Sequence, residues 1–164
     1  MIKSHKLLTL AQLTAQVKRL RALGLRIVFT NGCFDLLHAG HIRYLQRARE
    51  LGDILIVALN SDTSTAQLKG EGRPVQGEMD RAEILAALEP VDFVVIFRHL
   101  RCTEVIKQVQ PDVYAKGGDY RIDTLDASER EALEDCGVEI KFIAIHDDIS
   151  TTGLIDQIQA INNV

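Results

Sequence analysis

The sequence predicts a doubly wound α/β fold, in which helices cover both faces of a parallel sheet of about five strands. Short apolar segments alternate with segments of helical periodicity along the chain. The apolar segments lack polar alternation, as is typical of parallel strands that are buried on both faces. A length of 164 residues with 46% hydrophobic residues suits a single domain with a core of ordinary size.

The predicted helices are the segments in which apolar residues recur every three or four positions. In chain order they span residues 9–23, 41–51, 78–88, 103–109 and 127–136, and a last helix begins at residue 150. Thr9 stands at the N-cap position of the first helix, and Gly24 follows its last turn. Pro90 and Pro111 stop the two helices that precede them, because proline cannot continue a helix.

The predicted strands are short and rich in valine, isoleucine and leucine. They span residues 26–30, 53–59, 91–97, 112–115 and 138–144. Ligands of doubly wound sheets bind beyond the carboxyl ends of the strands, where the strand order reverses. The loops of interest are therefore those that follow each strand, namely residues 31–40, 60–77, 97–102, 116–125 and 145–150.

Charge and composition exclude several classes of protein. The formal charge of −4 disfavours a general nucleic-acid binder, since such proteins are usually basic. The apolar run 54–59 is too short to cross a membrane, and no signal peptide precedes it. The odd, widely spaced Cys33, Cys102 and Cys136 favour free thiols. We therefore expect a cytoplasmic protein without nucleic-acid or membrane partners.

The loop after the first predicted strand carries two histidines beside glycine. Asn31 and Gly32 form a turn in which Gly32 is able to adopt a positive φ and let a ligand approach the backbone. His38 and His41 are spaced so that one helical turn places both rings on one side, which Gly40 keeps open. The N-terminus of the following helix attracts phosphate. This loop is the main candidate for a phosphate-binding site.

A polar, glycine-rich loop follows the second predicted strand. Residues 61–77 are predicted to form a loop, with Asn60 and Asp62 at its start. Lys69 and Arg73 follow among glycines, which predicts a mobile basic lid around these two residues. Arg81 lies near the start of the next helix. Cations in these positions are suited to stabilise the charge of a polyphosphate.

Two later loops offer further ligand contacts. Lys116 suits a phosphate, Gly118 allows close backbone approach, and Asp119 suits a hydroxyl or amino group. Ser150 is expected to cap the last helix, whose hydroxyl and N–H groups are also able to hold a phosphate.

The first loop resembles the signature of the nucleotidyltransferase superfamily that includes the cytidylyltransferases. It reads Gly32-x-Phe34-Asp35-x-x-His38-x-Gly40-His41, which is complete at every fixed position. Residues 26–160 further resemble the adenylyltransferases of the ADP-heptose pathway, most specifically in the KGGDY string at 116–120. The lead-in at 146–149 is acidic, whereas that of the cytidylyltransferases for glycerol 3-phosphate is often rich in arginine. The chain departs from the family's pattern at Gly153, where relatives often carry a long and frequently basic residue.

The resemblance implies a Rossmann-like fold and the transfer of AMP from ATP, with Mg²⁺, to D-glycero-β-D-manno-heptose 1-phosphate for lipopolysaccharide core synthesis. The expected catalytic residues are His38, His41 and Lys69. The expected nucleotide-binding residues are Asn31, Gly32, Cys33, Phe34, Gly40, Lys116, Gly118, Asp119, Ser150, Thr151 and Thr152. The expected substrate-binding residues are Asp35, Asn60, Asp62, Arg73 and Arg81, and no protein side chain is assigned to a metal.

The same resemblance bears on organisation and partners. Residues 1–24 are expected to form an N-terminal helical segment ahead of the nucleotidyltransferase domain at 25–164. A homodimer is expected, and the apolar face of the first helix serves either the dimer or the core. The length leaves no room for the sugar kinase that is often fused to this domain, so we expect the heptose 7-phosphate kinase to be a separate protein.

Three other interpretations stay open at this point. A cytidylyltransferase acting on glycerol 3-phosphate or another small alcohol phosphate shares the histidine motif. A nucleotide-binding sensor without turnover would share the fold. A zinc site would need Cys/His ligands besides Cys33, which is the nearest candidate.

Overall fold

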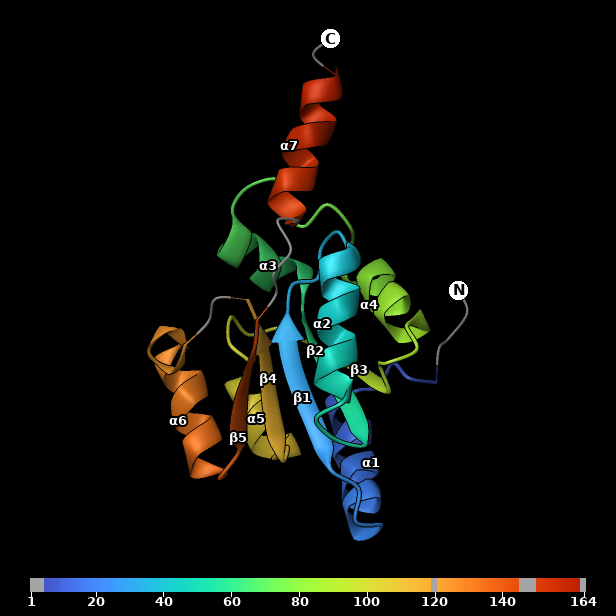
Figure 1. Ribbon diagram of the computed structural model, residues 1–164, viewed down its shortest axis with the longest axis vertical. Helices are drawn as coiled ribbons and strands as arrows, with labels where there is room; N and C mark the ends of the chain where they lie inside the picture. Colours follow the sequence, from blue (N-terminus) through green and yellow to red (C-terminus); the bar gives the residue numbers. More distant parts are fainter. Residues whose placement is uncertain (1–4, 119–120, 145–149, 163–164) are drawn as a thin grey trace.

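The computed structural model describes residues 5–118, 121–144 and 150–162. At its centre lies a five-stranded sheet in the order β3-β2-β1-β4-β5, and every pairing is parallel. The strands are β1 (Ile27–Gly32), β2 (Ile54–Asn60), β3 (Phe93–Phe97), β4 (Val113–Gly117) and β5 (Glu139–Ile143) (Figure 1). This topology confirms the predicted doubly wound α/β fold.

Helices cover both faces of the sheet, and each face has its own core. On one face lie α1 (Leu10–Ala22), α5 (Thr103–Val109) and α6 (Ala127–Asp135), and on the other α2 (Ala39–Arg49) and α4 (Glu78–Ala87). Along β1, Ile27 and Phe29 belong to the first core and Val28 to the second. This alternation explains why the strands are apolar throughout, because both faces are buried.

The N-terminal segment is part of this core. Thr9 caps α1 and forms a capping box with Gln12, and Gly24 follows the helix with φ of 78°, as predicted. Leu13 and Val17 are fully or almost fully buried on the sheet. The apolar face of α1 therefore packs in the core and is not available to a second chain.

A helix stands where the sequence predicts a loop. Residues Asp62–Lys69 form α3, so the prediction of a loop over 61–77 is wrong for its first half. The Ser61 hydroxyl accepts a hydrogen bond from the Ser64 amide, and the acidic and basic ends match the helix dipole. The buried residues of this helix include the polar Ser64 and Thr65, so the sequence shows no apolar periodicity here. Tertiary contacts stabilise the helix instead.

Other boundaries differ by a few residues, and these shifts matter for the site. β1 continues through Gly32 and β4 through Gly117, which carries both strands into the predicted loops. A short 3-10 helix, η1 (Ile122–Thr124), lies in the predicted 116–125 loop. The last helix, α7 (Thr151–Asn162), projects from the body of the molecule (Figure 1). Among the described residues, no helix is long and apolar enough to span a membrane.

Candidate active site

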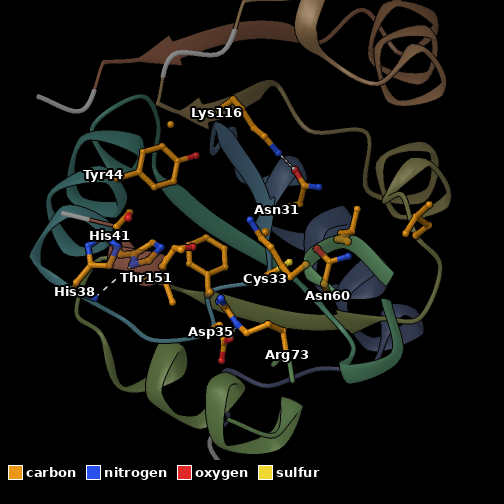
Figure 2. Close-up of a pocket in the computed structure, with 18 of the residues that line it drawn as sticks. Asn31, Cys33, Asp35, His38, His41, Tyr44, Asn60, Arg73, Lys116 and Thr151 are labelled. Atoms are coloured by element: carbon orange, nitrogen blue, oxygen red, sulfur yellow. Dashed lines mark hydrogen bonds and ion pairs between the residues drawn. The ribbon is translucent and has the colours of Figure 1, made fainter. Parts of the chain in front are cut away.

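A cavity of about 530 Å³ opens at the carboxyl ends of β1 and β4 (Figure 2). The strand order reverses between these two strands, which is where doubly wound proteins bind ligands. Their register pairs Val28 with Val113 and Phe29 with Tyr114, and no pair follows toward the carboxyl ends in the described sheet. The two strands thus leave room for a ligand between their ends.

Most of the predicted site residues line this cavity. They are Asn31, Gly32, Cys33, Phe34, Asp35, His38, His41, Asn60, Lys69, Arg73, Lys116, Ser150, Thr151 and Thr152. Four predicted residues do not line it, namely Gly40, Asp62, Arg81 and Gly118, and Asp119 lies outside the described residues. The cavity also has lining residues that the sequence analysis missed, which are Tyr44, Leu68, Leu100, Arg101, Gly117 and Glu129.

The two histidines stand at the start of α2, although His38 caps the helix instead of lying within it. Their ring centroids are 3.9 Å apart, and the His38 amide donates to Nδ1 of His41 at 3.4 Å. Burial lowers the pKa of His41 to about 4, and the charges of His38 and Lys69 add to this effect. His41 is therefore neutral at pH 7, and with Nδ1 as acceptor we assign its proton to Nε2.

The backbone before these histidines adopts a different conformation from the predicted one. Gly32 does not have a positive φ, whereas Phe34 does, at 43°. A Cβ on Gly32 would lie 2.9 Å from the Phe34 ring, so glycine is needed to let that ring fold back. The ring centroid of Phe34 then lies 5.5 Å from that of His41. Gly32 thus makes room for the Phe34 ring, and this ring packs beside His41. We call His38 and His41 together the histidine wall of the cavity.

Asp35 and Arg73 form an ion pair at the floor of the cavity (Figure 2). Oδ2 of Asp35 accepts from Arg73 Nε at 2.6 Å, and Oδ1 accepts from the amides of Val75 and Gln76. Asp35 is 3% exposed. It therefore holds the segment that carries Arg73 against the cavity, and both of its oxygens are already occupied by protein donors.

Arg81 is a buried support, so the structure does not bring this predicted substrate cation to the cavity. Its guanidinium donates to the carbonyls of Gln76, Cys33 and Asn60 and pairs with Asp62 at 2.7 Å. A buried guanidinium needs such acceptors, because it always carries charge and its N–H groups must be satisfied. Arg81 and Asp62 thereby join the β1 loop, the end of β2 and the start of α3.

Asn60 borders the cavity from the end of β2, and Lys69 borders it from the end of α3. Lys69 is the last residue of α3, and its charge acts on His41. Asn60 ends β2, is almost fully buried, and donates from Nδ2 to the Ser64 hydroxyl at 3.1 Å. The helix places the lysine at the rim of the cavity on an ordered element.

The N-terminus of α7 closes another side. The Thr151 hydroxyl donates to the Leu36 carbonyl at 3.0 Å, so α7 starts beside the histidine loop. Ser150 accepts from the Gly153 amide at 3.0 Å, as its predicted capping role requires. A Cβ on Gly153 would lie 3.2 Å from the Ser150 hydroxyl, so the small residue suits this tight cap.

The side of the cavity formed by β1, β4 and α6 is a network of polar side chains, which we call the Asn31 wall. The side-chain oxygen Oδ1 of Asn31 accepts from the Tyr114 hydroxyl at 2.7 Å and from Lys116 Nζ at 3.1 Å. The side-chain nitrogen Nδ2 of Asn31 donates to Oε1 of Glu129 at 3.3 Å. Burial lowers the pKa of Lys116, which Glu129 partly opposes. Figure 2 shows Asn31 and Lys116 apart from the group formed by His38, His41 and Thr151.

A sequence signal for Glu129 existed. Its positions relative to Ala132 and Leu133 put it on the buried stripe of α6. A charge on the apolar face of an amphipathic helix is uncommon and points to a specific partner.

Over the described residues there is no group of three His, Cys, Asp or Glu side chains that could hold a metal ion. Cys33, Cys102 and Cys136 are free, and Cys102 instead bonds Glu129. The zinc interpretation therefore has no ligand set in this part of the chain.

Two helix N-termini, a neutral histidine and nearby cations meet at the switch point of a doubly wound sheet. This arrangement is typical of doubly wound proteins that bind phosphate-bearing ligands. The chain belongs to the cytidylyltransferase-like family, which matches residues 29–157.

Curated relatives include the "Bifunctional protein HldE" of Pelobacter propionicus, 51% identical over 138 residues that cover 84% of this chain and 28% of that protein. The HldE protein of Geotalea uraniireducens is 48% identical over 154 residues, which are 94% of this chain and 31% of that one. The chain thus spans less than a third of the length of these relatives.

Two solved structures share the fold. The lipopolysaccharide core biosynthesis protein of Thermoplasma volcanium superposes with a TM-score of 0.62 at 30% identity, covering 77% of this chain and all of that one. Pantothenate synthetase of Thermus thermophilus superposes with a TM-score of 0.56 at 16% identity, covering 85% of this chain and 61% of that one. The second likeness shows the fold alone.

Proposed function

We propose that the chain transfers AMP from MgATP to D-glycero-β-D-manno-heptose 1-phosphate, releasing pyrophosphate and forming ADP-heptose. The observation that carries the proposal is the neutral His41 beside His38 at the N-terminus of α2, facing a cavity at the switch point. The HldE relatives and the lipopolysaccharide core biosynthesis protein support the choice of substrate.

The reaction is an in-line displacement at the α-phosphorus. A phosphate oxygen of the sugar 1-phosphate forms the new P–O bond, while the bond to the bridging oxygen of the β-phosphate breaks and pyrophosphate leaves with the electron pair. The nucleophile is anionic at neutral pH, so no general base is required. Positioning and charge stabilisation then supply the catalysis.

The residues divide these tasks by their chemistry. The Nε2–H group of His41 donates to an α-phosphoryl oxygen, and the α2 N-terminus favours the triphosphate. Lys69 and Arg73 offset the charge of the phosphates, with Arg73 held by Asp35. Mg²⁺ enters as part of the ATP substrate, since it prefers phosphate oxygens and few carboxylates.

A substrate panel tests the reaction directly. Purified protein is mixed with ATP or CTP and a set of sugar 1-phosphates and small alcohol phosphates, and pyrophosphate release is measured. We expect release with ATP and the heptose 1-phosphate. Release with CTP and an alcohol phosphate would replace the proposal by a cytidylyltransferase. Binding of ATP without product on the whole panel would indicate a nucleotide sensor.

His41→Ala tests the histidine. Loss of one transition-state donor lowers the rate by about 10²–10³-fold, so we expect a drop of that size in kcat. The exposed His5 gives the matched control, and His5→Ala should keep wild-type turnover. A folded His41→Ala variant with wild-type kcat would remove this histidine from the mechanism.

Lys69→Ala tests the cation at the rim. We expect a lower kcat/KM with an unchanged thermal midpoint, because Lys69 is exposed at the end of α3. Lys18→Ala, at an exposed position of α1, is the control. An unchanged kcat/KM in Lys69→Ala would place this lysine outside the site.

We also propose that the protein forms a homodimer. Ile158 and Ile161 on α7 are 54% and 74% exposed, which is unusual for large apolar side chains on one helix. Light scattering of the purified protein measures the mass, and a monomer at micromolar concentration would contradict this proposal.

A further inference from the structure

The cavity contains a buried carboxylate whose presence phosphate binding does not explain. Glu129 is 4% exposed and lines the cavity from α6, beside Asn31 and Lys116. A carboxylate repels phosphate groups, and burying one costs free energy unless it is well bonded. Its place at this wall therefore needs a reason other than the triphosphate.

One oxygen of Glu129 explains its structural role. Oε1 accepts from the Cys102 amide at 3.0 Å, the Cys102 thiol at 3.2 Å and Asn31 Nδ2 at 3.3 Å. The hydrogen bonds that described residues donate to Glu129 all end on Oε1. A carboxylate accepts hydrogen bonds on both oxygens, so Oε2 keeps its capacity for a ligand.

The network around Asn31 fixes the polarity of this wall. The Tyr114 hydroxyl and Lys116 Nζ both donate to the side-chain oxygen Oδ1 of Asn31. These two hydrogen bonds orient the side-chain amide so that Nδ2 faces Glu129. Asn31 thus anchors Oε1 of Glu129, and the hydrogen bonds from Tyr114 and Lys116 hold Asn31 in place. A preorganised acceptor of this kind selects ligands by the donors they carry.

In-line displacement decides which half of the reaction uses this wall. The attacking and leaving oxygens lie on opposite sides of the α-phosphorus. The histidines and the N-termini of α2 and α7 suit the phosphates of the nucleotide, and they form a group separate from Asn31 and Lys116 (Figure 2). The acceptor then approaches from the side of Asn31 and Lys116, so these two residues, which the sequence assigned to the nucleotide, are reassigned to the acceptor.

We propose that Oε2 of Glu129 accepts hydrogen bonds from neutral hydroxyl groups of the acceptor sugar, and that Glu129 therefore determines acceptor specificity. This inference rests on the proposed function, because it assigns one wall of the same cavity to the sugar. It requires an acceptor that is rich in hydroxyl groups and excludes a second anionic group at this wall.

Glu129→Gln is the decisive variant. Glutamine keeps a carbonyl oxygen for the Cys102 amide and Asn31, and it replaces the ligand-facing acceptor by an NH₂ donor. We expect KM for the heptose 1-phosphate to rise about 10- to 100-fold, the effect of losing one hydrogen bond to a charged group. KM for ATP should stay within about twofold of wild type. Glu131→Gln, at an exposed position of the same helix, is the matched control.

Deoxy analogues of the acceptor provide a second measurement that needs no variant. The wild-type protein should use at least one deoxy sugar 1-phosphate about tenfold less well than its parent, because Oε2 would lose a donor. In Glu129→Gln this discrimination should disappear. If the variant does not fold, wild-type protein that uses every deoxy analogue as well as the parent sugar still overturns the inference.

The outcomes separate the two proposals. No product from wild type with any sugar 1-phosphate would overturn the proposed function and this inference together. Product formation with a raised KM for ATP, or an equal change for both substrates, would overturn the inference alone. Wild-type protein that uses all deoxy analogues as well as the parent sugar would also overturn it.

Discussion

Acid should destabilise this protein through His41. The folded state lowers the pKa of this imidazole from 6.5 to about 4, mainly because the ring is buried. Below pH 6.5 the unfolded chain therefore binds a proton that the folded protein does not bind. The free energy of unfolding should fall as pH decreases from 6.5 toward 4, and this contribution should be constant above pH 7.

The size of the effect follows from the two pKa values. A difference between 6.5 and about 4 corresponds to a loss on the order of 2 kcal/mol at pH 5 relative to pH 8. The limit at still lower pH is about 3 kcal/mol. Either value is a large share of the stability of an ordinary domain, which is about 5–15 kcal/mol.

Urea unfolding of wild type and His41→Gln between pH 8 and pH 5 isolates this contribution. Glutamine does not titrate, so the free energies of the two proteins should converge by about 2 kcal/mol toward pH 5. Every other titratable group is the same in both proteins, so its contribution cancels in the difference. His5→Gln, at an exposed position, is the matched control. A constant difference between wild type and His41→Gln across this range would refute the reasoning.

Three further substitutions test the structure around the site by denaturant unfolding. Tyr44→Phe removes the hydroxyl that donates to the buried Ala115 carbonyl, so it should cost about 1–3 kcal/mol, and an unchanged midpoint would contradict the contact. Asp35→Asn leaves Arg73 without its charged partner and should lower the free energy of unfolding by about 3–5 kcal/mol. A loss below about 1 kcal/mol, the value of an exposed pair, would show that water screens this ion pair. Gly52→Ala places a Cβ 2.8 Å from the Arg26 carbonyl oxygen and should lower the free energy of unfolding by about 1–3 kcal/mol. An unchanged free energy of unfolding would contradict this close contact.

The histidine wall was predictable because its information is local. His38 and His41 lie three residues apart at the junction of a strand and a helix, and the chain geometry of that junction brings them together. Lys69 was found as a cation beside the site, but its helix was missed. Serine and threonine in α3 give no apolar periodicity, although Ser64 and Thr65 are buried.

Arg81 and Glu129 show where such reasoning fails. Both were judged by residue type, which made Arg81 a candidate for phosphate binding and left Glu129 unnoticed. The acceptors of Arg81 come from three separate segments, and the partners of Glu129 come from β1 and the start of α5. Whether a charged group meets protein or ligand depends on these distant partners, which have no trace in the neighbouring sequence.

The residue pattern alone was sufficient for the parallel sheet, the approximate bounds of its five strands and the histidine turn, because periodicity, helix caps and proline stops act within one or two turns of chain. Packing decided the rest. It made α3 a helix, turned Asp35 and Arg81 inward as supports, and left one oxygen of Glu129 for a ligand. The physical reason is that burial and hydrogen-bond satisfaction are set by segments far apart in the chain, and only the folded structure brings them together.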